Sequence, residues 1–305
     1  MIIRIARMAI MICSLVLASM PLSTMAEDVL GKKPHHVWGG ASSVVNNQAI
    51  TKMIWAPGID DGYVPQGLTV AEGSVLLSSY KSTDSKVARG PCRVFKIDAQ
   101  TGEYTSHFDL PEECGHAGGL VYLGKGSLVV SDTRKLYKVD LKKAFQDGDT
   151  KNALLAVVKL AGDLKGSFID FDGTSIFIGS SEKDASEAKA FFLPVSIFED
   201  HNGKTIKEDI ATRSFPIAAE AQGATFDRKG NLWMTFSNSK HGELQKVDPA
   251  TGKVLAQYDM VIGIQDISFD DDGRLWSVSE AGCLRWSKWS KTYPLVFQMD
   301  VTKLK

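Results

Sequence analysis

The feature that most limits how this chain can fold is a unit of roughly 50 residues that recurs along it. Five seven-residue segments align without gaps, and each follows a short turn that contains glycine. These segments are SVLLSSY (74–80), SLVVSDT (127–133), SIFIGSS (175–181), NLWMTFS (231–237) and RLWSVSE (274–280). A short apolar run precedes each turn, as GLTV (67–70) precedes the first. An apolar run, a glycine turn and a second apolar run predict a β-hairpin in every unit.

Two further strands are predicted after each hairpin. The third strands are VFKID (94–98), LYKVD (136–140), FLPVS (192–196), LQKVD (244–248) and VFQMD (296–300). The fourth strands are TSHFDL (105–110), LAVVKL (155–160), TRSFPI (212–217) and LAQYDM (255–260). The fifth unit lacks a fourth strand of its own, but TKMIWA (51–56) has the right pattern and directly precedes the first unit.

Four strands per unit predict an all-β protein, a β-propeller with five four-stranded blades. We expect residues 51–56 to pair beside 296–300 and to close the ring, which leaves no long exposed edge strand. The alternative is a ring of six blades. Residues 27–50 are too polar and rich in glycine to supply four more strands, and the unassigned stretch 197–211 is too short.

The first 26 residues have the pattern of an export signal. Arg4 and Arg7 precede an apolar run, and Thr24-Met25-Ala26 suits cleavage. We therefore expect residues 27–305 to form a single propeller domain that is periplasmic or secreted. The apolar run is short for a membrane anchor, which is the alternative. Without this segment the chain keeps all 36 acidic residues and loses two of 35 basic ones, so its net charge is about −3 and nucleic-acid binding is not expected.

Three cysteines follow the export signal: Cys92, Cys114 and Cys283. An oxidising compartment would permit one disulfide. Cys92 and Cys114 are nearest in sequence, but spacing alone does not settle the pairing. No CxxC or HxxxH spacing indicates a zinc site.

The segments FDRKGNLWMTFS (226–237) and FDDDGRLWSVSE (269–280) are similar to the repeat unit of a broad group of propellers. The group includes gluconolactonase and regucalcin-like lactonases, NHL-repeat proteins and quinoprotein-like propellers. The resemblance implies the fold but no single activity. The lactonases are usually six-bladed and hold a divalent metal with Glu, Asn and Asp in the channel, and that trio has no match here. VPQGLTV (64–70) and GHAGGLV (115–121) also resemble blade starts of secreted propellers, which imply no activity.

Chain direction places the candidate site on one face of the ring. Connections between blades and loops between second and third strands should share that face, and a concave mouth favours small ligands. The candidate ligand contacts there are Gln66, Tyr80, Gln222, Gln265 and Asp266. The candidate catalytic residues are His116, Asp132 and Glu280. Repetition of the glutamines equally fits a structural role, since buried amides hydrogen-bond backbone groups, and His116 could be a satisfied channel histidine.

Two further features bear on chemistry. Oxygen ligands from Asp132 and Glu280 would suit calcium, and two carboxylates on different blades would also suit glycoside cleavage. The insertion 280–293 carries Trp286 and Trp289 among cationic residues, which predicts either a ligand lid or a loop that packs over the blade edge. The sequence shows no GxSxG, P-loop, Rossmann or HExxH motif.

Two functional hypotheses follow from these residues. The first is an exported propeller that binds a small ligand or a protein partner at its channel mouth. The second is a lactone- or sugar-directed hydrolase, with or without a divalent metal, that uses His116, Asp132 and Glu280. The sequence does not decide whether the protein is an enzyme.

Overall fold

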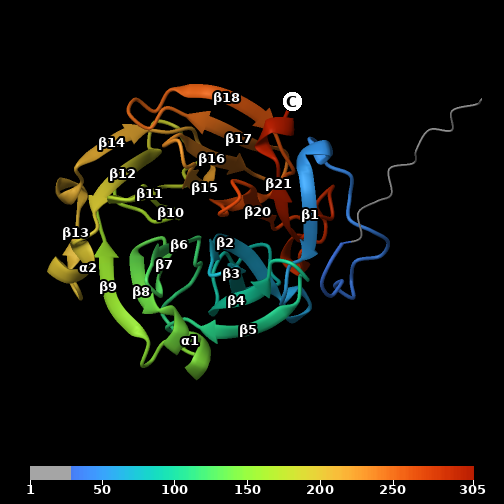
Figure 1. Ribbon diagram of the computed structural model, residues 1–305, viewed down its shortest axis with the longest axis horizontal. Coiled ribbons are helices and arrows are strands. Elements are labelled where there is room, and N and C mark those ends of the chain that lie inside the picture. The colour runs from blue at the N-terminus through green and yellow to red at the C-terminus, as the bar shows by residue number, and fades with distance from the viewer. Residues whose placement is uncertain (1–28) are drawn as a thin grey trace, which may run out of the picture.

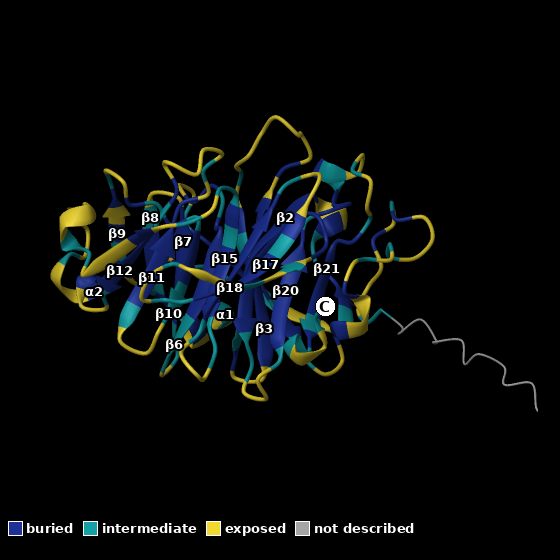
Figure 2. Ribbon diagram, turned by 90° about the horizontal axis from the view of Figure 1, so that it is seen from above, coloured by how far each residue is buried: buried dark blue, intermediate teal, exposed yellow. Residues whose placement is uncertain are grey.

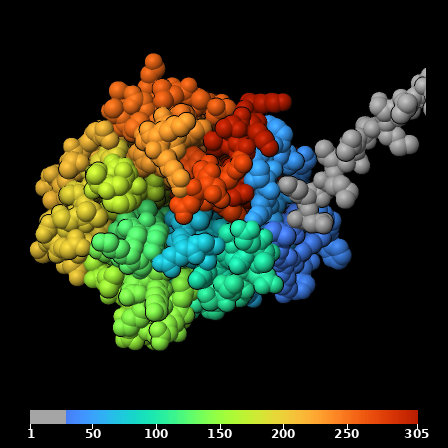
Figure 3. Space-filling model, viewed as in Figure 1, coloured from blue at the N-terminus to red at the C-terminus, as the bar shows by residue number. Residues whose placement is uncertain are grey.

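The protein is a five-bladed β-propeller, described here from a computed structural model of residues 29–305. The five blades follow one another around a central axis (Figure 1). The space-filling view shows them as successive sectors of one ring (Figure 3). The predicted export signal, residues 1–26, lies outside the described residues.

Each blade is an antiparallel sheet whose first strand lies nearest the axis (Figure 1). Blades one and two contain β2 (Tyr63–Ala71), β3 (Ser74–Lys81), β4 (Cys92–Asp98) and β5 (Tyr104–Asp109), then β6 (Gly119–Gly124), β7 (Ser127–Asp132), β8 (Lys135–Asp140) and β9 (Leu154–Leu160). Blades three and four contain β10 (Phe168–Phe171), β11 (Ser175–Gly179), β12 (Lys189–Pro194) and β14 (Arg213–Pro216), then β15 (Ala221–Phe226), β16 (Leu232–Ser237), β17 (Gly242–Val247) and β18 (Val254–Asp259). Blade five contains β19 (Ile264–Phe269), β20 (Leu275–Ser279), β21 (Leu295–Met299) and β1 (Ile50–Trp55).

The ring is closed by the strand that the sequence predicted. β1 pairs antiparallel with β21, with Ile54 opposite Val296 and Trp55 opposite Leu295. The side chains of Ile54 and Trp55 are buried, so closure adds apolar burial to backbone hydrogen bonds. The five-bladed prediction is confirmed, and the six-bladed alternative is wrong because no further sheet is present in residues 29–305.

Short additions lie at the rim of the ring (Figure 1). α1 (Leu141–Asp147) follows β8 and begins at the cap residue Asp140, whose side chain accepts a hydrogen bond from the Lys143 N–H. α2 (Ile197–Asp200) and the two-residue β13 (Thr205–Ile206), which pairs parallel with β9, occupy the stretch between β12 and β14. Most strand residues are buried, whereas exposed residues concentrate in the loops (Figure 2).

Glycine near the start of the first strands allows the blades to approach closely around the axis. A Cβ on Gly67 would lie 2.7 Å from the carbonyl carbon of Gly119 in the next blade. A Cβ on Gly119 would lie 2.6 Å from the Ile169 nitrogen, and one on Gly223 would lie 2.5 Å from the Asp266 Cα. These contacts are with backbone, which cannot move aside cheaply, so the repeated glycine is a packing requirement.

The repeated aspartate and tryptophan of the hairpins also have a structural cause. Asp227 accepts a hydrogen bond from the Trp233 indole at 3.1 Å, and Asp270 accepts one from Trp276 at 2.8 Å. Both carboxylates also accept backbone N–H groups within their own turns. The acidic segment 269–273 is therefore an ordinary hairpin turn, in which Asp270 binds the backbone and the Trp276 indole.

Candidate functional site

One face of the ring contains a cavity of about 650 Å³, which we call the mouth cavity. It is bordered by the connections that lead into first strands and by the loops between second and third strands, as the sequence predicted. The side chains that line it and that the sequence singled out are Gln66, Tyr80, His116, Asp132, Gln222, Gln265 and Glu280. The lining side chains that the sequence reasoning missed include Arg89, Arg134, Lys165, Glu182 and Arg285.

His116 stands in the turn that joins β5 to β6. Its ring stacks on Tyr80 with centroids 4.8 Å apart and an interplanar angle of 23°. Its Nδ1 lies 3.0 Å from the carbonyl oxygen of Ala88. A carbonyl only accepts, so Nδ1 carries the hydrogen and the neutral ring leaves a lone pair on Nε2.

The environment of His116 favours this neutral form. Burial lowers the pKa of His116 below its ordinary value of 6.5, and the positive charges of Arg285 and Arg89 act in the same direction. Hydrogen bonding to Ala88 and the charge of Asp132 oppose the shift without reversing it. Within the described chain, Nε2 has no hydrogen-bond partner and remains available to a ligand in the cavity.

Asp132 organises this turn. Its carboxylate accepts backbone N–H groups from Gly115 at 3.2 Å, His116 at 2.8 Å and Ala117 at 3.3 Å. Successive N–H groups converging on one anion form a nest. Ala117 has a φ of 50°, in the left-handed region that non-glycine residues rarely adopt. Asp132 therefore lines the cavity as the residue that holds His116 in place.

Glu280 directly follows β20, in blade five. It accepts a hydrogen bond from the Gln66 amide at 3.1 Å. Burial raises the pKa of Glu280 to about 7, although the nearby Trp286 indole, the charge of Arg285 and the hydrogen bond from Gln66 favour the ionised form. This carboxyl group can therefore hold or release a proton near neutral pH.

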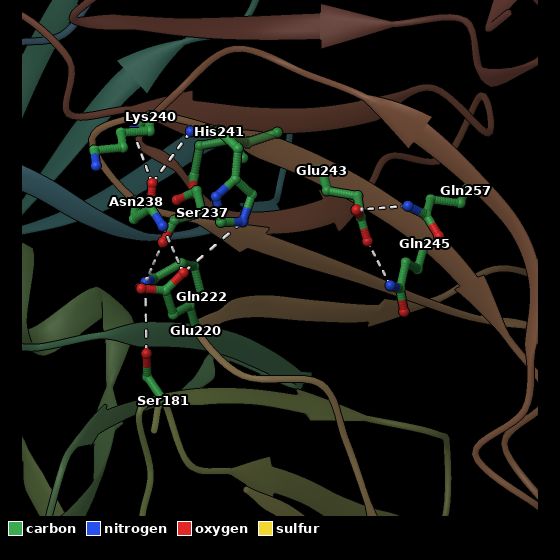
Figure 4. Close-up of polar contacts among 11 residues, drawn as sticks. Ser181, Glu220, Gln222, Ser237, Asn238, Lys240, His241, Glu243, Gln245 and Gln257 are labelled. Carbon is green, nitrogen blue, oxygen red and sulfur yellow. Dashed lines mark hydrogen bonds and ion pairs between the residues drawn. The ribbon is translucent and has the colours of Figure 1, made fainter. Parts of the chain in front are cut away.

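The three glutamines lie at corresponding positions and contact their neighbours. Gln222 donates to the Ser237 carbonyl at 3.2 Å and lies 3.5 Å from the Ser181 hydroxyl of the preceding blade (Figure 4). Gln66 donates to the Pro65 carbonyl as well as to Glu280. Gln265 is buried, with its side chain at the cavity wall. These contacts support the structural interpretation of Gln66 and Gln222, while all three amides still border the cavity.

Asp266 lies outside the lining of the mouth cavity, contrary to its expected position as a ligand contact. It is fully buried, and its Oδ2 accepts the backbone N–H groups of Leu68 at 3.0 Å and Leu120 at 3.1 Å. One carboxylate of blade five thus links blades one and two. Burial raises the pKa of Asp266 well above its ordinary value, so the neutral acid is favoured.

The tryptophans of the 280–293 insertion also lie outside the cavity lining. Trp286 and Trp289 stack on each other at 4.9 Å, and Trp286 packs against the hydrophobic core. The interpretation as a packed loop therefore accounts for their positions. Arg285 of the same insertion lies in the cavity wall instead. It is buried, and its guanidinium carbon lies 4.2 Å from the centroid of the Trp286 ring.

The calcium hypothesis does not fit the groups in the mouth cavity. Both oxygens of Asp132 accept backbone N–H groups, and Glu182 is paired with Lys165. No group of three or more His, Cys, Asp or Glu residues within 29–305 is arranged to hold a metal ion. Four cationic side chains also border the cavity, which opposes a second cation there.

The three described cysteines are free, buried thiols. The thiols of Cys92 and Cys114 lie close together, and their interaction is the main cause that raises the pKa of Cys114. Burial is the main cause that raises the pKa of Tyr80, and the nearby Cys283 acts in the same direction. Burial also raises the pKa of Cys283 to about 12, and the charge of Glu280 adds to this shift. The disulfide that an oxidising compartment would permit is not formed among these three cysteines, although Cys92 and Cys114 lie close together.

Elsewhere, a groove of about 730 Å³ lies at the ring closure, between residues 31–34 and the β4–β5 hairpin. Its Arg93 is paired with Asp109. No residue that the sequence singled out lines this groove. A separate finding concerns membranes: within residues 29–305, no helix has the length and apolar character needed to cross a bilayer.

Comparison with known proteins supports the fold and leaves the activity open. No family model matches the chain, and no curated protein matches it. A hypothetical protein from Leishmania major is 13% identical, with a TM-score of 0.50 over 83% of this chain and 91% of that one. A luciferin-regenerating enzyme is 11% identical, with a TM-score of 0.46 over 79% and 92% of the two chains.

Hydrazine synthase from Kuenenia stuttgartiensis is 13% identical, with a TM-score of 0.40 over 70% of this chain. The match spans only 56% of the hydrazine synthase chain, so the likeness concerns part of a larger protein. The propeller architecture is given by the order of the strands in the five sheets. At 13% identity, the likeness to the Leishmania major protein concerns the fold alone.

Proposed function

We propose that this protein is an exported propeller that binds a small polar ligand in the mouth cavity. The observation that carries the proposal is the position of His116 at the cavity wall, with Nδ1 anchored on Ala88 and Nε2 without a partner among the described residues. A histidine fixed through one ring nitrogen presents the other in a defined direction, as ligand-binding and catalytic histidines do. Export follows from the sequence pattern of residues 1–26.

Thermal unfolding in the presence of a library of sugars, lactones and carboxylic acids tests this proposal. A ligand that binds only the folded protein raises the melting temperature with increasing concentration. We expect at least one compound to stabilise the native protein and to lose most of this effect in His116→Ala. His201→Ala is the matched control, because His201 lies at the end of α2 on the rim of the ring and does not border the mouth cavity.

Two outcomes would reject the proposal. One is a library in which no compound stabilises the native protein. The other is a stabilising compound whose effect is the same in His116→Ala and His201→Ala, since that compound would bind elsewhere.

Hydrolysis of a lactone or a glycoside is the second candidate function. It is favoured by the combination of a neutral His116 with an open Nε2, which can accept a proton from water, and Glu280, which can donate one near pH 7. Asp132 would position His116 in this scheme. Hydrolysis of nitrophenyl glycosides and of δ-lactones should then fall in both His116→Ala and Glu280→Gln. Equal turnover by the native protein and both variants would exclude this function.

A further inference from the structure

Unpaired guanidinium groups are concentrated at the mouth cavity. Three of the arginines described by the structure line it and have no carboxylate partner: Arg89, Arg134 and Arg285. Of the arginines elsewhere in residues 29–305, Arg213 stacks on the Phe192 ring, and the other three have a carboxylate partner: Arg93 pairs with Asp109, Arg228 with Asp271 and Arg274 with Asp300. The positive charge at the cavity is therefore a local feature of the fold.

Two of these guanidinium groups are held rigidly by neutral acceptors. Arg285 donates from Nε to the Asp84 carbonyl at 3.1 Å, from Nη2 to the Ser85 carbonyl at 3.2 Å, and from Nη1 to the Tyr80 hydroxyl. Arg134 donates from Nη1 to two backbone carbonyls, at 2.7 and 2.9 Å. Carbonyl and hydroxyl groups satisfy hydrogen-bond donors without cancelling their charge, so both side chains are pre-organised and still cationic.

Arg89 has its donors available. It is exposed at the cavity rim and makes no hydrogen bond within the described chain. Its guanidinium lies directly over Gly115, where a Cβ would stand 2.8 Å from both Nε and Nη2. Gly115 thus leaves room for the Arg89 guanidinium next to the turn that carries His116, and the planar fork of Arg89 matches a carboxylate or a phosphate.

The carboxylates of the cavity are already engaged. Asp132 accepts three backbone N–H groups, Glu182 is paired with Lys165, and Glu280 accepts the Gln66 amide. Only the Lys165–Glu182 pair cancels charge directly, so three guanidinium groups share the cavity with two carboxylates, and the lining keeps a net charge of +1 (four cations, three carboxylates) on a chain whose overall charge is −1. A concave site of one sign raises the local concentration of ligands of the opposite sign.

We infer that the mouth cavity binds a small organic anion. This inference rests on the proposed function and specifies its ligand class. Three guanidinium groups without an ion-pair partner line one cavity, and about 650 Å³ accommodates a tricarboxylic acid or a phosphorylated sugar. Carboxylate and phosphate share the chemistry that these arginines recognise.

Titration calorimetry with citrate, inorganic phosphate and glucose tests the inference. We expect citrate or phosphate to bind and glucose not to bind. The ratio of their affinities tells a carboxylate site from a phosphate site. Arg89→Gln should weaken anion binding at least tenfold, and added salt should weaken it further because it screens the charges. Arg228→Gln is the matched control, because Arg228 is exposed and lies outside the cavity lining.

The outcomes separate this inference from the proposed function. If glucose binds in a way that depends on His116 and neither anion binds, the inference of an anionic ligand is rejected, and the proposed ligand site in the mouth cavity is retained. Anion binding of equal strength in Arg89→Gln and Arg228→Gln also rejects it, because the anion would then bind outside the cavity. If neither anion binds, the inference fails, and the compound library decides the proposed function independently.

Discussion

Replacement of Asp132 by alanine should lower the free energy of unfolding of the protein. The substitution removes the acceptor of three backbone N–H groups, whose N–O distances are 2.8, 3.2 and 3.3 Å. A buried donor left without a partner costs about 1–3 kcal/mol. The two longer bonds are weaker and water from the cavity can replace part of the loss, so we expect the free energy of unfolding to fall by about 2–4 kcal/mol.

Calorimetric melting measures this effect directly. At about 2–4 °C per kcal/mol for a domain of roughly this size, the melting temperature should fall by about 4–16 °C. Asp184→Ala is the control, since Asp184 also accepts a backbone N–H, from Ser186, but in an exposed loop. That change should cost less than about 1 kcal/mol. A melting temperature in Asp132→Ala equal to that of Asp184→Ala would refute the role of Asp132 as the residue that holds the His116 turn.

Three further changes test other parts of the structure. Gly119→Ala places a Cβ against the backbone of the next blade and should destabilise the protein by about 1–3 kcal/mol in chemical denaturation; unchanged stability would contradict the close approach of the blades. Burial raises the pKa of Asp170 to about 7, so the folded state binds its proton more tightly than the unfolded state, and the stability due to this group is lost as pH rises from about 4 to 7. Stability curves against pH should therefore differ in slope between the native protein and Asp170→Asn within that window, and parallel curves would disprove the assignment. A mild oxidant should join Cys92 and Cys114, seen as a loss of two hydrogens in intact mass that Cys114→Ser abolishes; an oxidised product that still forms in Cys114→Ser would contradict the pairing.

The architecture was predictable from the sequence because its determinants are local and repeated. Each hairpin is specified by apolar strands around a glycine turn, as in SLVVSDT (127–133) after Gly126. Repetition then requires the units to pack on one another, since no unit can bury its sheet alone. The strand at 51–56 was identifiable because it supplies the one element missing from the fifth unit, and its pairing with β21 confirms the prediction.

The candidate site was predictable only in outline. The strand direction fixes which loops share a face, and this placed His116, Asp132 and Glu280 at one cavity. The sequence contained no signal for the direction of each side chain or for what it would contact. Asp266 therefore looked like a ligand contact, yet it lies in the channel wall and links three blades.

The sequence by itself determined the number of blades, the closure of the ring and the face on which the mouth opens, because these follow from strand periodicity and chain direction. Only the tertiary structure decided the charge of the mouth. Arg89 and Arg285 are far apart in the chain and belong to irregular loops, whose conformation has no periodic pattern. They meet at one cavity because blade five closes against blade one, and the carbonyls that hold Arg285 belong to Asp84 and Ser85 in the β3–β4 loop of blade one.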